Sequence, residues 1–204
     1  MNEFIYENNN ALTSEYCDHL IALFESNKEL QHEGEIGIDE SAIDKESVIL
    51  KNIKTTIDIT IPNNIGKDSV FYDVQKLLTT VLLENLKEYY KKLDPTNEIY
   101  HLDFLHTKVG FNGFLMTKYL KQKGFFKLHN DFNIDNNRYR LFNFIWYLND
   151  VDEGGKTIFF DNSNIAPKKG KMAIFPSDWF FSHKGEKPIS SDKYIITGWI
   201  YNEK

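Results

Sequence analysis

The sequence has 204 residues, of which 41% are hydrophobic and 15% aromatic, and its formal net charge at pH 7 is −6. This length and apolar content predict one folded domain with a large core and exclude a disordered chain. The acidic balance disfavours a sequence-independent grip on nucleic-acid phosphates, so no nucleic-acid partner is expected.

The single cysteine and the amino terminus set the expected compartment. Cys17 excludes an internal disulfide and favours a reducing environment. The sequence opens without a basic and apolar leader, and no run approaches the roughly 18 apolar residues of a membrane span. We therefore expect a cytoplasmic protein without membrane contact, with Cys17 buried in a helix. The oligomeric state is left open.

The first half of the chain predicts two helices and short strands. After an extended start at residues 4–6, the hydroxyls of Thr13 and Ser14 cap a predicted amphipathic helix that ends near residue 26. Polar residues 27–46 predict a mobile loop, which is either idle surface or a lid, and β-branched residues at 48–50 and 55–61 predict strands. Apolar positions 70, 74, 77, 81, 82, 86 and 89 predict a helix of about six turns that begins near residue 68, ends before Asp94-Pro95 and backs a sheet.

The second half consists of short β-rich runs separated by turn signals. The predicted strands are residues 99–105, 113–120, 125–129, 141–148, 157–160, 172–175 and 194–201. Many strands without intervening helices predict an antiparallel sandwich or barrel, for which a jelly roll is one solution. No internal repeat and no second domain are evident.

A candidate metal site combines three residues. His129 and Asp131 stand two apart in a predicted strand, so their side chains project to the same side, and His183 is the best third ligand. Two imidazoles and one carboxylate, with other positions open, suit non-haem Fe(II) that also binds a co-substrate and O2. Chance alone gives roughly one His-x-(Asp/Glu) match in such a chain, and we interpret a second match, His101 and Asp103, as structural.

Lys193 distinguishes the match at His129 and Asp131 from the match at His101 and Asp103. It stands ten residues beyond His183 and opens an apolar strand. A lysine placed there can hold the far carboxylate of a dicarboxylic co-substrate as a point charge.

From about residue 118 to 201 the chain resembles the prolyl 4-hydroxylase-type group of Fe(II)- and 2-oxoglutarate-dependent dioxygenases. The resemblance rests on an ordered set: Tyr119, His129 and Asp131, the run 144–149 leading into 153–160, residues 167–176, then His183, Lys193 and Trp199. It implies a double-stranded β-helix (jelly roll) core at residues 99–204, with residues 1–98 as a flank whose helices pack on one sheet.

The resemblance also implies the roles of the site residues. His129, Asp131 and His183 would ligate iron, and Lys193 would pair with the C5 carboxylate of 2-oxoglutarate. Tyr119 or Tyr147 would donate a hydrogen bond to that co-substrate, and Trp199 would pack beside it. Fe(II), 2-oxoglutarate and O2 are the implied cofactors, with ascorbate as an added reductant.

Each of these residues also has a plainer interpretation. His129 alone is a satisfied strand histidine, Tyr119, Tyr147 and Trp199 are buried aromatics, and Arg140 is either a substrate contact or a solvated strand residue. Gly154 and Gly155 are interpreted as hairpin geometry and not as a phosphate loop, because no helix opens after them.

The leading hypothesis is an oxygenase that hydroxylates an unactivated C–H bond while 2-oxoglutarate and O2 become succinate and CO2. The resemblance alone suggests a prolyl residue in a peptide or protein as substrate; free amino acids and other small molecules stay open. Two rivals are a non-catalytic jelly-roll binding module and a nucleobase oxygenase. A purely structural metal usually has four ligands, which argues against the first, and the acidic charge argues against the second.

Overall fold

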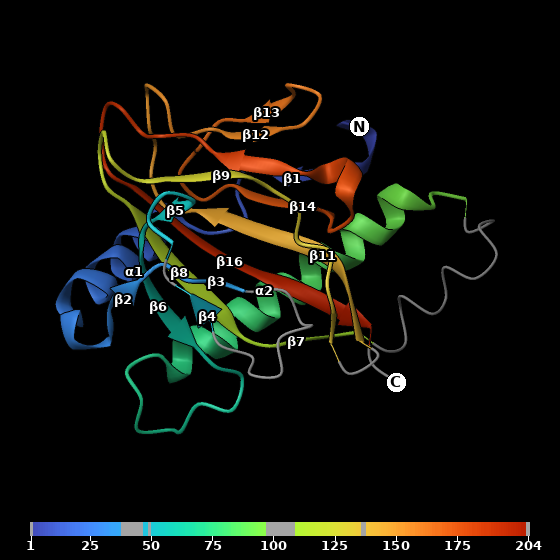
Figure 1. Cartoon of the computed structure of the whole chain (residues 1–204). Helices are drawn as coiled ribbons and strands as arrows, with labels where there is room; N and C mark the ends of the chain where they lie inside the picture. Colours follow the sequence, from blue (N-terminus) through green and yellow to red (C-terminus); the bar gives the residue numbers. More distant parts are fainter. Residues whose placement is uncertain (1, 38–46, 49, 97–108, 136–137, 203–204) are drawn as a thin grey trace.

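Two antiparallel sheets face one another in the computed structural model (Figure 1). The structure describes all residues except 1, 38–46, 49, 97–108, 136–137 and 203–204. The large sheet has nine strands, in the order β1-β14-β11-β16-β8-β6-β2, with β10 paired to β11 and β7 to β16. The small sheet has five, in the order β13-β12-β15-β9-β5, and a separate pair joins β3 to β4.

The strands of the large sheet are β1 (Tyr6–Asn8), β2 (His32–Glu33), β6 (Ile57–Ile61), β7 (Val109–Phe111), β8 (Phe114–Tyr119), β10 (Ile134–Asp135), β11 (Arg138–Tyr147), β14 (Met172–Pro176) and β16 (Lys193–Asn202). Those of the small sheet are β5 (Lys54–Thr55), β9 (Phe125–His129), β12 (Thr157–Phe159), β13 (Asn164–Ile165) and β15 (His183–Gly185). The remaining pair is β3 (Ile36–Gly37) and β4 (Ser47–Val48).

The side chains of strand β11 pack into two hydrophobic cores, one on each face of the large sheet. Its side chains alternate, so Phe142, Phe144 and Trp146 face the core that contains the helices. Ile145 and Tyr147 face the second core, between the two sheets. The large sheet is therefore covered on both faces, and the inner face leads to the site described below.

Two α-helices cover the outer face of the large sheet (Figure 1). Helix α1 (Ser14–Ser26) begins where the Thr13 side chain accepts a hydrogen bond from Tyr16 N at 3.2 Å, as the capping pattern predicts. Helix α2 (Tyr72–Leu93) buries Val74, Leu78, Leu82 and Leu86 against the sheet. Among the described residues, no helix combines the length and the hydrophobicity that crossing a membrane requires.

Several predicted boundaries are confirmed and several are wrong. The first helix and the strand at 125–129 agree with the structure, and five other strands differ only at their ends. The second helix begins at Tyr72 and not near residue 68; the predicted apolar positions Val70 and Leu77 are exposed, while Leu78 lies in the core. Residues 27–37 are not only loop, because they contain the 3-10 turn η2 (Lys28–Leu30), β2 and β3.

The predicted strand at 55–61 is interrupted at Thr56, where the chain passes from the small sheet to the large one. Of the strand predicted at 48–50, Val48 is paired, as part of β4, and Leu50 lies in no strand, while residue 49 is outside the described residues. The prediction for residues 99–105, with His101 and Asp103, also lies outside the described residues. Gly154 and Gly155 both have φ of +72°, consistent with the turn that the sequence predicts.

Candidate metal centre and co-substrate cavity

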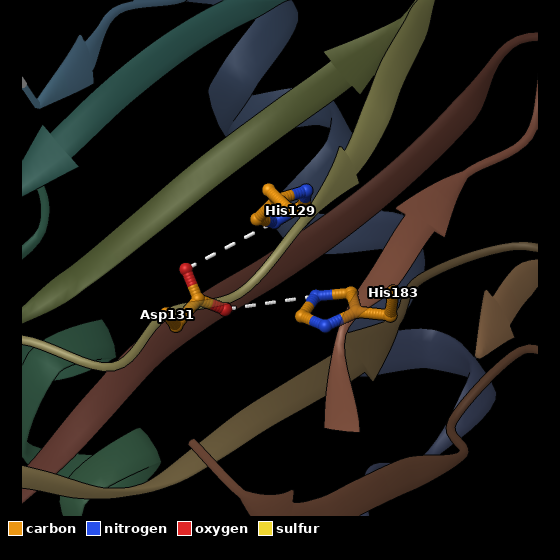
Figure 2. A group of neighbouring side chains, drawn as sticks. All are labelled: His129, Asp131 and His183. Carbon is orange, nitrogen blue, oxygen red and sulfur yellow. Dashed lines mark ion pairs between the residues drawn. The ribbon is translucent and has the colours of Figure 1, made fainter. Parts of the chain in front are cut away.

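Three side chains converge between the sheets (Figure 2). His129 is the last residue of β9 and His183 the first residue of β15, and the two lie opposite each other in the strand pair. Figure 2 shows the Asp131 carboxylate between them, with Oδ1 3.9 Å from His129 Nε2 and Oδ2 3.6 Å from His183 Nε2. One potential ligand atom from each residue lies within 4.8 Å of the others, and no other group of three such residues occurs in the described part of the chain.

The structure corrects the reason for this convergence. Strand β9 ends at His129, so Asp131 is placed by the segment after the strand and not by strand alternation. The pairing of β15 with β9 also shifts register, because His183 is opposite His129 while Gly185 is opposite Phe126. This bulge turns Phe126 and His129, three residues apart, toward the same cavity.

Backbone carbonyls fix the orientation of both imidazoles. His129 Nδ1 lies 2.7 Å from Lys127 O, and His183 Nδ1 lies 3.1 Å from Phe181 O. Each Nδ1 therefore carries the proton and each Nε2 presents its lone pair toward Asp131. Burial, with the neighbouring His129, lowers the pKa of His183 to about 4, which keeps this ring neutral.

This donor set fits Fe(II). Two neutral imidazole nitrogens and one carboxylate oxygen, all from one side, leave the opposite positions open for further ligands. A closed structural site would instead offer a fourth protein ligand, and none joins these three among the described residues.

The three residues border a cavity of about 620 Å3 between the sheets. The buried side chains of Tyr119 and Lys193 line this cavity, as do Gly185, Trp199 and Arg140. The volume leaves room for a small dicarboxylic acid together with part of a second molecule.

Lys193 is a buried cation on the wall of this cavity. Its side chain is 1% exposed, and its Nζ donates to Gly155 O at 2.9 Å. It forms no ion pair with any described residue, and burial lowers its pKa to about 7, opposed by the more distant Glu186. A buried ammonium without an anion is costly, so the position suits an anionic ligand.

The two predicted tyrosines differ in position. Tyr119 lines the cavity, and an ideal Cβ on Gly185 would lie 3.0 Å from its hydroxyl, so glycine at 185 leaves the space that the tyrosine occupies. Burial, then Asp58, raises the pKa of Tyr119, which therefore stays a neutral donor. Tyr147 does not line the cavity; its hydroxyl shares a hydrogen bond of 2.7 Å with Thr157, which does.

Arg140 and Trp199 form one unit on the cavity wall. The guanidinium carbon lies 4.1 Å from the centroid of the Trp199 ring, Nε donates to the Tyr201 hydroxyl at 3.1 Å, and Nη1 lies 3.5 Å from Asp131 O. Arg140 is thus not only a solvated strand residue, because it contacts the segment that carries a candidate ligand.

Sequence reasoning did not single out four residues that shape this region: Lys54, Phe126, Gly155 and Thr157. Gly155 was seen only as a turn residue, and its carbonyl contacts Lys193. The other three line the cavity, and their placement depends on strand pairing that the local sequence does not display.

Comparison with known proteins agrees with this geometry. Residues 114–201 match the model of the 2OG-Fe(II) oxygenase superfamily. No curated protein sequence matches the chain. The match contains all three candidate metal ligands and Lys193.

Solved structures share the fold. A prolyl hydroxylase from Trichoplax adhaerens, in complex with a hypoxia inducible factor peptide fragment, aligns with a TM-score of 0.70 at 18% identity, covering 98% of this chain and 84% of that one. The viral collagen prolyl hydroxylase from Paramecium Bursaria Chlorella virus-1, in its 2OG complex, gives 0.64 at 18% identity, covering 98% and 97%. A Pseudomonas putida prolyl-4-hydroxylase gives 0.60 at 14% identity, covering 98% and 93%. The predicted jelly roll with flanking helices is confirmed.

Proposed function

We propose, from the match of residues 114–201 to the model of the 2OG-Fe(II) oxygenase superfamily, that this protein hydroxylates an unactivated C–H bond of a peptidyl proline. The observation that carries the proposal is the buried, anion-free Lys193 in the same cavity as the His129, Asp131 and His183 cluster. In this proposal residues 1–98 and 99–204 form one functional domain, because Lys54, from the first of these parts, lines the same cavity.

Each residue of the candidate site has a role in this proposal. His129, Asp131 and His183 hold Fe(II), which with 2-oxoglutarate and O2 supplies the oxidant while the keto acid becomes succinate and CO2. Lys193 binds the C5 carboxylate, and Tyr119 donates a hydrogen bond to the same carboxylate. The sheets around Lys193 and Tyr119 bury both side chains and exclude water from them. Arg140 and Trp199, on the wall of the same cavity, bind the substrate.

The proline assignment has its own support. Three structural neighbours carry prolyl hydroxylase names, and one of them was solved with a peptide. The cavity has room for a side chain beyond the co-substrate. At 14–19% identity the neighbours share the fold alone, so the substrate must be tested directly.

The first experiment tests the cofactor. Metal-free protein receives Fe(II) and then 2-oxoglutarate under anaerobic conditions, and the visible charge-transfer band of the chelated keto acid is recorded. We expect the band in the wild type and its loss in His183→Ala, with an unchanged far-ultraviolet circular dichroism spectrum. Metal binding without the band would favour a non-catalytic binding module.

The second experiment tests the substrate. Proline-containing peptides and free amino acids, L-proline included, are incubated aerobically with protein, Fe(II), 2-oxoglutarate and ascorbate, and mass spectrometry detects the addition of one oxygen atom. We expect a modified peptide and unmodified free proline, with His183→Ala inactive on both. Modification of a free amino acid alone would replace the prolyl assignment while leaving the oxygenase chemistry in place.

A further inference from the structure

Phe126 lies flat against the ring of the candidate ligand His129. The two ring centroids are 3.6 Å apart and the planes differ by 15°. The imidazole also makes a hydrogen bond from Nδ1 to Lys127 O and lies 4.5 Å, centroid to centroid, from the tilted His183 ring. A single hydrogen bond leaves the ring free to tilt about its axis, and the flat contact removes that freedom.

Phe126 itself is supported from one side. Its neighbours across the strands are Lys54 on β5 and Gly185 on β15. Gly185 has no side chain, so Lys54 is the cross-strand side chain beside the ring. The Lys54 ammonium lies 5.6 Å from the Phe126 centroid, within the range of a cation–π contact.

Lys54 is in turn held by Asp58. Its Nζ lies 2.6 Å from Asp58 Oδ2, and the two side chains are 6% and 1% exposed. Lys54 belongs to β5, the last strand of the small sheet, and Asp58 to β6 of the large one, so the pair links the two sheets. Because apolar residues replace buried ion pairs at little or no cost in stability, stability alone is a weak explanation for this pair.

We propose that Phe126 is a positioning residue for His129 and that the Lys54–Asp58 pair holds Phe126 in place. The pair and the ring fix the direction of the His129 Nε2 lone pair before metal arrives. This inference rests on the proposed function, since it supposes that His129 binds metal.

The first test removes the ring. Mn(II) is titrated into metal-free wild type, Phe126→Leu and Phe126→Tyr, and the free ion is followed by electron paramagnetic resonance. We expect Phe126→Leu to bind about tenfold more weakly, the lower end of the effect of outer-shell partners, and Phe126→Tyr to retain wild-type affinity. Phe125→Leu, one residue away on the same strand and opposite Thr55, serves as the matched control and should bind normally.

The second readout needs no metal. Nitrogen-15 spectra of the histidine rings in metal-free protein should show one His129 tautomer in the wild type and a tautomer mixture in Phe126→Leu. Loss of packing volume alone would lower the melting temperature without changing the tautomer. If the wild type and Phe126→Leu bind Mn(II) equally and share one His129 tautomer, the positioning role is overturned.

The third test removes the ion pair as a unit, which avoids leaving one buried charge alone. Lys54→Met combined with Asp58→Leu should weaken Mn(II) binding in the same direction as Phe126→Leu, by a smaller factor. The control removes Lys51 and Glu33, an exposed pair at 2.6 Å in the same region, and should have no effect. An unchanged affinity in the first double variant overturns the role of the pair. A wild type that binds no metal would instead overturn the proposed function itself.

Discussion

Lys193 and Tyr119 lie opposite each other across β16 and β8, with Lys193 Nζ 4.0 Å from the centroid of the Tyr119 ring. The face of the Tyr119 ring partly offsets the cost of burying the Lys193 ammonium, and Gly155 O accepts a hydrogen bond from that ammonium. Neither partner neutralises the charge. The pair is therefore preorganised for an anion that reaches it through the cavity.

Replacing Lys193 with Met should raise the concentration of 2-oxoglutarate needed for half-saturation about 100-fold, because losing one partner of a buried charge pair costs about 2–5 kcal/mol. Metal affinity should stay near that of the wild type, since Lys193 is not a ligand. Calorimetric titration of the Mn(II)-loaded protein with 2-oxoglutarate measures the first, and Mn(II) titration the second. Lys184→Met, at an exposed position of β15, is the control. Equal loss of both affinities would indicate structural damage.

Affinity for 2-oxoglutarate should fall as the pH rises. The pKa of free Lys193 is lowered to about 7 by burial, so the ammonium is present below that pH and must be regained by proton uptake above it. With saturating Mn(II), calorimetry should therefore show weaker binding at about pH 8.5 than at about pH 6.5, approaching tenfold per pH unit. Lys193→Arg should abolish this dependence, because guanidinium stays charged throughout. The same slope in both proteins would place the titrating group elsewhere.

The same group predicts a change in stability with pH. The folded pKa of Lys193 lies below its ordinary value of 10.5, so between about 7 and 10.5 the unfolded chain binds a proton that the folded chain lacks. The free energy of unfolding should therefore rise with pH in this window, relative to Lys193→Met. Urea unfolding of the two metal-free proteins across the window measures the difference. A free energy of unfolding that falls with rising pH, relative to Lys193→Met, would contradict the burial of an unpaired Lys193.

Replacing Tyr119 and replacing Tyr147 should have different effects, because the two hydroxyls have different contacts. Tyr119→Phe removes a hydroxyl from a cavity-lining ring and should weaken 2-oxoglutarate binding by about 1 kcal/mol, or roughly fivefold. Tyr147→Phe leaves Thr157 without its 2.7 Å partner and should act less on binding than on the melting temperature. Calorimetry and thermal unfolding of both variants test this. A larger loss of affinity in Tyr147→Phe would reverse the assignment.

Much of the fold and of the candidate site could be predicted, because these features depend on residues close together in the sequence. The strand at 125–129 and the helix that ends at Ser26 follow from apolar spacing, and the candidate ligands follow from residue type and order. Many short strands without helices between them predict an antiparallel sandwich or barrel, and the family resemblance implies the jelly roll among these.

The rest depends on pairing between distant segments. Strand β15, which carries His183, is three residues long and contains a lysine and a glycine, so its sequence gives no strand signal. The bulge that turns Phe126 toward His129 exists only in the β9–β15 register. Thr157 and Lys54 reach the cavity through partners that lie far away in the sequence.

Asn85 on α2 offers a test of the fold away from the site. It is buried, its Oδ1 accepts from the Tyr6 hydroxyl at 3.0 Å and from Asn8 Nδ2 at 2.8 Å, and its Nδ2 donates to Val81 O. This amide therefore ties β1, at the edge of the large sheet, to the helix that covers it.

Asn85→Ala should lower the free energy of unfolding by about 2–3 kcal/mol, because it leaves two donors of β1 without their acceptor and opens a small cavity. Urea unfolding monitored by circular dichroism measures the change, and Thr80→Ala, an exposed position on the same helix, is the control. The 2-oxoglutarate affinity of the folded fraction should be unaltered, since Asn85 does not line the cavity. A loss of affinity at full folding would mean that the edge of the large sheet shapes the site, which the present contacts do not predict.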